Sequence, residues 1–341
     1  LLGAYLKAYQ LTRRRSYADV AAGIISGLVR EMGLEGGGFA ASMGGGGAQG
    51  HGYLPVAPEA LKEVMSPQEL EALTLRYGMV GSSPLGHTAP FPLATKRSLP
   101  EIARRMNLTL YDAQLALARA EEILRRERRA GAMGPLIKDT TLQVAWNAQL
   151  ATVLFEGERI LGNQEAGKAA LATVERILGG MDPEFSAVPL VLTPDGSGGA
   201  DVSASRLMTA QSLLAAHETT GEARYLAQAK RIVDGTLDAF WDEKGGGFFD
   251  TLEGQSKSLL MGTQFKDLLD GVQPSTNGVG LSVLQSLSRW TGDPRYAALA
   301  QEALSTFEPL APQLGPLGGA FGQALLETVS PPPLVLIAGE G

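Results

Sequence analysis

The chain has 341 residues, of which 44% are hydrophobic, 6% aromatic and 19% charged. This composition suits one large hydrophobic core or two ordinary ones, and it excludes disordered and collagen-like chains. With 29 basic and 36 acidic residues the net charge is −7, so we expect no nucleic-acid partner. The absence of cysteine excludes disulfides, thiolate metal sites and cysteine nucleophiles within these residues.

The chain opens with a helix-like segment, Leu1–Gln10, and does not begin with methionine. We therefore expect the true start of the protein, and any targeting segment, to lie upstream. No apolar run approaches the roughly 18 to 20 residues that a membrane-spanning helix needs, and no signal-peptide pattern is present. We expect a cytoplasmic protein that does not span a membrane.

A repeated frame predicts helical hairpins. In three places a threonine is followed five residues later by a tyrosine, with alanine-rich flanks. The three copies are Thr12–Tyr17, Thr220–Tyr225 and Thr291–Tyr296. Apolar residues at helical spacing precede each threonine, and a helix-length stretch follows each tyrosine. A glycine-rich turn then ends in Phe39, Phe248 or Phe321, and a weaker fourth copy begins at Ala145.

Each copy is therefore predicted to be a helix, a tight turn, a second helix and a glycine-rich loop. An αα-hairpin cannot bury its apolar stripe alone, so several must stack as a solenoid or close into a ring. Long glycine-rich loops at one end of alternate helices favour the ring, in which they surround a central funnel. We predict an all-α protein, an (α/α)6 toroid of αα-hairpins, with an αα-solenoid as the alternative.

Capping patterns predict three further helix starts after the first copy. They lie at Ser66–Glu69, Ser98–Glu101 and Thr109–Asp112. The helix that begins at Thr109 ends in a basic run at residues 125–129. Because cations complement the dipole at a helix C-terminus, we interpret this run as a solvated helix end and not as a nucleic-acid patch.

Three segments resemble motifs of one known family. They are residues 98–150, with an arginine-rich helix before Lys138-Asp139 and Trp146-Asn147, residues 245–251, GGGFFDT, and residues 270–278, DGVQPSTNG. Their order and spacing are similar to those of the YyaL-type family of thioredoxin-domain-containing proteins, which includes spermatogenesis-associated protein 20-like proteins. The opening residues up to Tyr53 are similar to the middle of that family's domain, so the resemblance covers essentially all of the chain.

The resemblance implies an (α/α)6 toroid related to the N-acylglucosamine 2-epimerases and six-hairpin glycosidases, preceded in the family by a thioredoxin-like domain. It also implies that the first hairpins of the toroid lie before Leu1. We therefore expect residues 1–330 to form a toroid domain that is truncated at its N-terminus. Residues 331–341, which open with three prolines, are similar to the start of a short terminal β segment.

Several acidic residues of the family are replaced in this sequence. Its acidic cluster after the first glycine-rich turn corresponds to Met43–Gly46, and Thr140-Thr141 stand in place of the second half of a Lys-Asp-Asp-Lys motif. The family's Leu-Asp-Asp-Tyr-Ala helix start corresponds to residues 203–207, SASRL, with Asp201 nearby. The resemblance thus implies a degenerate member that has lost catalytic carboxylates.

Sugar epimerisation and glycoside hydrolysis need paired acid and base groups, commonly two carboxylates. Three carboxylates remain in glycine-containing connections, namely Asp139, Asp250 and Asp270. In a closed toroid they converge at one mouth as a catalytic set. The alternative is a role in helix caps and turns, where aspartate is common.

Polar and aromatic residues near the same loops are candidates for ligand binding. They are Lys138, Trp146, Asn147, Ser275, Asn277, Tyr53 and His51. The lysine, asparagines and serine can bind a polyol through hydrogen bonds, whereas the aromatic rings form either a sugar-stacking wall or part of the core. No zinc, calcium, phosphate-loop or serine-hydrolase motif occurs, so we expect neither a metal nor a cofactor.

Two functions from different classes follow. In the first, a non-catalytic toroid serves as a binding or structural subunit for a protein partner or larger complex, with a sugar-like ligand as a further candidate. In the second, the protein is a carbohydrate-active enzyme, an epimerase, isomerase or glycosidase, that uses the loop carboxylates. A redox role through a thioredoxin-like domain is a third function, against which the absence of cysteine argues. The replaced acidic residues favour the first.

Overall fold

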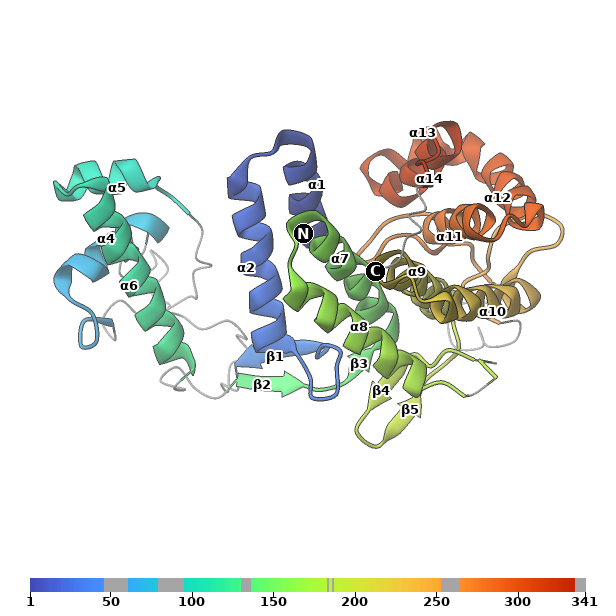
Figure 1. Ribbon diagram of the computed structural model, residues 1–341, viewed down its shortest axis with the longest axis horizontal. Coiled ribbons are helices and arrows are strands. Elements are labelled where there is room, and N and C mark those ends of the chain that lie inside the picture. The colour runs from blue at the N-terminus through green and yellow to red at the C-terminus, as the bar shows by residue number, and fades with distance from the viewer. Residues whose placement is uncertain are drawn as a thin grey trace, which may run out of the picture. The chain divides into compact units, whose positions relative to one another are not determined.

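The computed structural model describes residues 1–45, 61–78, 95–129, 136–182, 184–185, 187–252 and 264–334. These residues are predominantly helical, so the predicted all-α class is confirmed (Figure 1). The chain divides into two compact units, one of Leu1–Ala41 with Thr140–Gly341 and one of Ser42–Asp139. The separate compactness of residues 42–139 was not predicted, because the expected toroid domain spans residues 1–330 without a break.

The described part of the first unit contains four αα-hairpins in chain order. They are α1 (Leu2–Thr12) with α2 (Arg15–Met32), α7 (Val144–Leu161) with α8 (Gln164–Gly179), α9 (Ser203–Thr220) with α10 (Ala223–Phe240), and α11 (Thr276–Thr291) with α12 (Pro294–Phe307). Short helical turns follow, namely η2 (Glu308–Leu310), α13 (Ala311–Leu314) and η3 (Gly315–Gly318), and then helix α14 (Gly319–Val329).

Helices α1, α7, α9, α11 and α14 form an inner row in which each packs against the next (Figure 1). Each hairpin's second helix packs against its own first helix. This succession agrees with the hairpin order expected of an αα toroid, whose closure into a ring stays a prediction. A three-stranded antiparallel sheet of β3 (Leu142–Gln143), β4 (Val191–Thr193) and β5 (Gly196–Gly198) lies at the start of α7.

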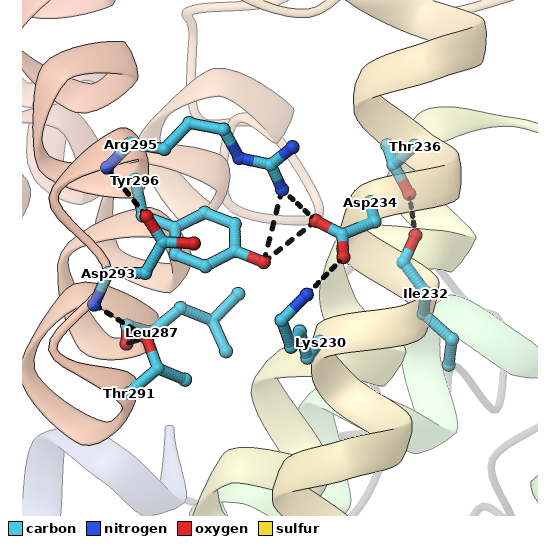
Figure 2. Close-up of polar contacts among 9 residues, drawn as sticks. All are labelled: Lys230, Ile232, Asp234, Thr236, Leu287, Thr291, Asp293, Arg295 and Tyr296. Atoms are coloured by element: carbon cyan, nitrogen blue, oxygen red, sulfur yellow. Dashed lines mark hydrogen bonds and ion pairs between the residues drawn. The ribbon is translucent and has the colours of Figure 1, made fainter.

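The Thr-x4-Tyr frame builds the turns of three hairpins. The hydroxyls of Thr12, Thr220 and Thr291 each donate to the carbonyl four residues back, at 2.7 to 2.8 Å. Each hydroxyl also accepts from the backbone N–H two residues ahead, at 3.2 to 3.3 Å, as Figure 2 shows for Thr291. The residue directly after each threonine has a left-handed backbone conformation, with φ of 73° at Gly221 and 71° at Gly292. Glycine adopts this conformation without a clash because it has no Cβ.

Arg13 occupies the same left-handed position in the first hairpin, with φ of 55°. A residue with a Cβ is strained by about 1 kcal/mol in this conformation, and glycine removes the strain. Glycine also increases the conformational entropy of the unfolded chain, which cancels part of this stabilisation. We therefore expect Arg13→Gly to raise the melting temperature by about 1–2 °C, measured by thermal unfolding. Arg13→Ala keeps the Cβ and is the matched control; equal melting temperatures for the two variants would contradict this account.

The second unit is built on α4 (Pro67–Tyr77), α5 (Leu99–Met106) and α6 (Leu110–Arg129), which share a small apolar core. The three predicted helix starts are confirmed, since the Glu69, Glu101 and Asp112 carboxylates each bond to the residue directly before their helix. Strands β1 (Ser42–Gly45) and β2 (Leu136–Asp139) pair antiparallel in this unit.

The core of the first unit is dominated by side chains from the repeats. Tyr225, Tyr296, Phe155, Phe240 and Phe248 are fully buried. Within the described ranges, no helix has the length and apolar character needed to cross a membrane. Residues 331–334 follow α14 without regular structure, and the rest of the predicted β segment lies outside the described residues.

Candidate functional site

The inner row of helices in the first unit lines a hollow. Three adjoining cavities of about 480, 410 and 400 Å³ share lining residues, and Glu156 of α7 lines all three. The second of them also reaches Asp270 and the starts of α11 and α14. Because concave spaces of this size accept a small molecule, we take the three cavities together as the candidate site.

Amide and hydroxyl groups converge on this hollow from different helices. They are Gln149 and Thr152 of α7, Gln211 of α9, Ser282 of α11 and Gln323 of α14. An amide or a hydroxyl both donates and accepts hydrogen bonds, which matches the hydroxyl groups of a polyol. Trp290 adds an aromatic wall and meets the His217 ring edge-on, with 4.7 Å between ring centroids.

Glu156 is the titratable group that stands out in the hollow. Burial raises the pKa of its carboxyl, while the positive charges of Arg159 and Lys7 act in the opposite direction. It forms no hydrogen bond or ion pair with the residues that the structure describes. A carboxyl with a raised pKa that faces a cavity is a candidate proton donor.

Sequence reasoning missed Glu156 because it lies in the middle of a helix and outside any motif. A signal was nevertheless present. Gln149, Thr152 and Glu156 recur at spacings of three and four in α7, which places them on one face of the helix. A polar stripe on a buried helix indicates a wet cavity.

The carboxylate of Asp270 borders the hollow, but both of its oxygens accept hydrogen bonds from the backbone. Its oxygens accept hydrogen bonds from the N–H groups of Ser275, at 2.9 Å, and Ala320, at 2.8 Å. It thereby joins the start of α11 to the start of α14. Asp250 likewise accepts from the N–H of Phe265, at 3.0 Å, and does not line the three cavities. Both residues fit the cap and turn role that was the alternative.

Asn147 and Asn277 hold the two glycine-rich turns. The Oδ1 of Asn277 accepts from the N–H of Phe248 at 2.7 Å, and its Nδ2 donates to the carbonyls of Phe248, at 3.0 Å, and Asp267, at 2.9 Å. Asn147 makes the same pair of bonds to Phe39, at 2.7 and 3.1 Å, and a third to the carbonyl four residues back.

These asparagines are not placed to contact a ligand, contrary to the expectation from sequence. Asn147 is 4% exposed and Asn277 is 1% exposed. The side-chain Nδ2 of each already donates two hydrogen bonds to backbone carbonyls. The turns they hold need glycine. Gly38 and Gly247 have φ of 77° and 83°, and a Cβ would lie 2.3 Å from Leu142 and 2.6 Å from Phe307, respectively.

The remaining candidates of the first unit are Ser275 and Trp146. Ser275 is fully buried before α11, and its hydroxyl has no hydrogen-bond partner among the described residues. Trp146 lies on α7 with 46% of its surface exposed and does not line the three cavities. Neither is brought to the hollow as a ligand contact.

Lys138 and Asp139 lie on β2 in the second unit, whereas Asp250 and Asp270 belong to the first. His51 and Tyr53 lie outside the described residues. Across the described ranges, no group of three or more potential metal ligands is clustered. The residues that the structure does gather in the hollow are mostly different from those expected, with Asp270 as the shared member.

Comparison with known proteins finds distant relatives. The chain is 23% identical to human spermatogenesis-associated protein 20, over 85% of this chain and 40% of that protein. The mouse protein of the same name is 24% identical, over 84% and 40%. The chain thus spans about 40% of the length of these curated relatives. The predicted resemblance is confirmed at this distant level, while no protein-family model matches the chain.

Solved structures show weaker likeness. A D-mannose isomerase is 15% identical with a TM-score of 0.43, covering 89% of this chain and 72% of that one. A glycoside hydrolase family 76 mannosidase from Bacteroides thetaiotaomicron is 13% identical with a TM-score of 0.42, covering 84% and 70%. A cellobiose 2-epimerase from Spirochaeta thermophila is 18% identical with a TM-score of 0.39, covering 49% and 43%.

Proposed function

We propose that the hollow of the first unit binds a polyhydroxylated, sugar-like ligand and that the protein does not convert it. The observation that carries this proposal is the state of the loop carboxylates. Asp270 accepts two backbone N–H groups and Asp250 accepts one. The other two carboxylates that line the hollow with Glu156, those of Glu218 and Glu327, accept hydrogen bonds from Arg159 and Gln323. Amides and hydroxyls on four inner helices supply the hydrogen bonds that such a ligand needs.

Titration calorimetry with a panel of aldohexoses and their N-acetylamino derivatives tests this proposal. We expect one of them to bind, and Gln211→Ala to weaken its affinity about three- to tenfold through the loss of one or two hydrogen bonds. Gln301→Ala, on the exposed part of α12, is the control and leaves affinity unchanged. The proposal fails if no sugar binds, or if both variants bind as tightly as the unaltered chain.

A carbohydrate-active enzyme is the second candidate, favoured by the raised pKa of Glu156. The same titrated samples, followed by NMR for epimer or hydrolysis products, separate the two functions. An acid role makes turnover fall as pH rises through the raised pKa of Glu156, and Glu156→Gln abolishes it. If product forms, and both Glu156→Gln and a folded Asp270→Asn variant abolish it, the protein is an enzyme. In that case the proposal of binding without conversion is wrong.

Two further proposals concern the whole protein. The family resemblance supports a thioredoxin-like domain before Leu1, and the replaced acidic residues at Met43–Gly46 and Thr140-Thr141 favour a protein partner. Mass spectrometry of the protein purified from its source under mild conditions tests both. A chain near twice this length supports the upstream domain, and a stoichiometric companion supports the partner.

A further inference from the structure

Successive hairpins of the first unit are joined by a buried tyrosine and a carboxylate. The hydroxyl of Tyr225 on α10 donates to Oε1 of Glu175 on α8 at 2.5 Å, and Arg224 pairs with the same carboxylate at 2.7 Å. The next hairpin repeats this arrangement. The hydroxyl of Tyr296 on α12 donates to Asp234 on α10 at 2.7 Å. Figure 2 shows this contact.

Arg295 and Lys230 also bond to Asp234, so this carboxylate is surrounded by donors (Figure 2). Burial alone would raise the pKa of Asp234, but hydrogen bonds from Lys230 and Tyr296 outweigh it and hold the pKa below its ordinary value. Burial and the bond to Asp234 raise the pKa of the Tyr296 hydroxyl. At neutral pH the pair is therefore a phenol that donates to a carboxylate. We call each such set of tyrosine, arginine and carboxylate a tyrosine bridge.

A positional rule describes where the bridges occur. Each tyrosine is the third residue of its helix, and each carboxylate, Glu175 or Asp234, is the twelfth residue of the preceding second helix. Between α2 and α8 both halves are absent. The third residue of α8 is Ala166, and the twelfth residue of α2 is Ser26. The two halves are thus present or absent together at each described junction.

Helix α2 breaks this pattern, because it has one half of a bridge with no counterpart. Its third residue is Tyr17, which is preceded by Ser16 and not by an arginine. The guanidinium of Arg14, three residues before the tyrosine, lies 5.3 Å from the centre of the Tyr17 ring. The arginines directly before Tyr225 and Tyr296 lie 4.3 and 5.0 Å from their ring centres. The Tyr17 hydroxyl forms no hydrogen bond, and Arg14 no ion pair, with the residues that the structure describes.

We propose that Tyr17 and Arg14 form a docking site on α2 for an αα-hairpin whose second helix carries aspartate or glutamate at its twelfth position. The chemistry of the site selects this partner, since a phenol and a guanidinium side by side bind a carboxylate. A second copy of this chain does not fit. Glu175 and Asp234 are already bonded, and the twelfth residue of α12 is Ser305.

The test places a hairpin of this type before Leu1. One extended chain carries a copy of residues 203–275, with the equivalent of Asp234, and another carries a copy of residues 144–202, with the equivalent of Glu175. In an extended chain whose added hairpin docks, Tyr17→Phe lowers the melting temperature by about 4 °C, because the hydrogen bond from the Tyr17 hydroxyl to the charged carboxylate of the added hairpin is lost. In the chain of 341 residues the same change has no effect.

The control variants isolate the added carboxylate. Changing it to asparagine or glutamine removes the effect of Tyr17→Phe, whereas Tyr296→Phe lowers the melting temperature in every chain. If Tyr17→Phe is neutral in both extended chains, the proposal is overturned. It is also overturned if the chain dimerises in sedimentation and Tyr17→Phe abolishes the dimer, because the occupant is then a second copy.

Discussion

Asn277→Ala is expected to lower the free energy of unfolding of the first unit by about 3–5 kcal/mol, measured by denaturant unfolding. The change leaves the buried N–H and carbonyl of Phe248 without their partners, and the carbonyl of Asp267 keeps only the bond from the backbone N–H of residue 277. Each unpaired buried group costs about 1–3 kcal/mol, and part of this is relieved if water enters. Asn147→Ala is expected to have a loss of similar size, because it holds the other glycine-rich turn.

Asn163→Ala is the matched control for this prediction. Asn163 caps α8 through a single bond to the N–H of Ala166, at 3.0 Å, and its loss should cost about 1 kcal/mol. Equal losses for Asn163→Ala and Asn277→Ala would show that the turn held by Asn277 tolerates solvent. In that case the asparagine would be free to turn toward a ligand, as the sequence suggested.

Asp201→Asn is expected to lower the free energy of unfolding by about 3–5 kcal/mol, because it removes the charged carboxylate from its ion pair with the buried guanidinium of Arg206. Arg206 lies at the start of α9 with 4% of its side chain exposed. Its Nε and Nη2 bond to the two carboxylate oxygens of Asp201, at 2.9 and 2.5 Å. The guanidinium also lies over the ring of Phe240, 5.4 Å from its centre.

Two comparisons separate the buried charge from general damage. Asp19→Asn breaks the exposed pair with Arg15, at 3.7 Å, and should leave stability unchanged. Arg206→Met combined with Asp201→Asn should recover much of the loss, because the buried charge is removed together with the carboxylate that paired with it and an unbranched apolar side chain fills the space. A double variant less stable than Asp201→Asn would instead assign the main role to the packing of Arg206 on Phe240.

The fold was largely predictable because its signals are local. The Thr-x4-Tyr frame places a turn between two helices, and the bonds of Thr12, Thr220 and Thr291 show why that spacing recurs. Capping boxes such as Ser66 with Glu69 also act within a few residues. The pairing of β1 with β2, in contrast, joins residues over 90 apart, and its short strands carry no alternating pattern.

The candidate site was harder to predict because residue type does not reveal direction. A loop asparagine looks the same whether it faces a cavity or, like Asn277, the backbone of a neighbouring turn. The aspartates of the loops have the same ambiguity. The carboxylate of Asp270, for example, accepts hydrogen bonds from backbone N–H groups at the starts of two helices. Glu156 is recognised as a candidate only when α7, α9, α11 and α14 are seen to surround one hollow.

The uneven distribution of tyrosine bridges has a consequence for cooperativity. In an array of hairpins, each unit is stabilised mainly by its neighbours, and the weakest junction determines where the array opens first. Two junctions carry a bridge, at Tyr225 and Tyr296, but the junction between α2 and α8 has alanine and serine in the corresponding places. The α1–α2 hairpin can therefore separate from the rest at a lower free energy than global unfolding requires.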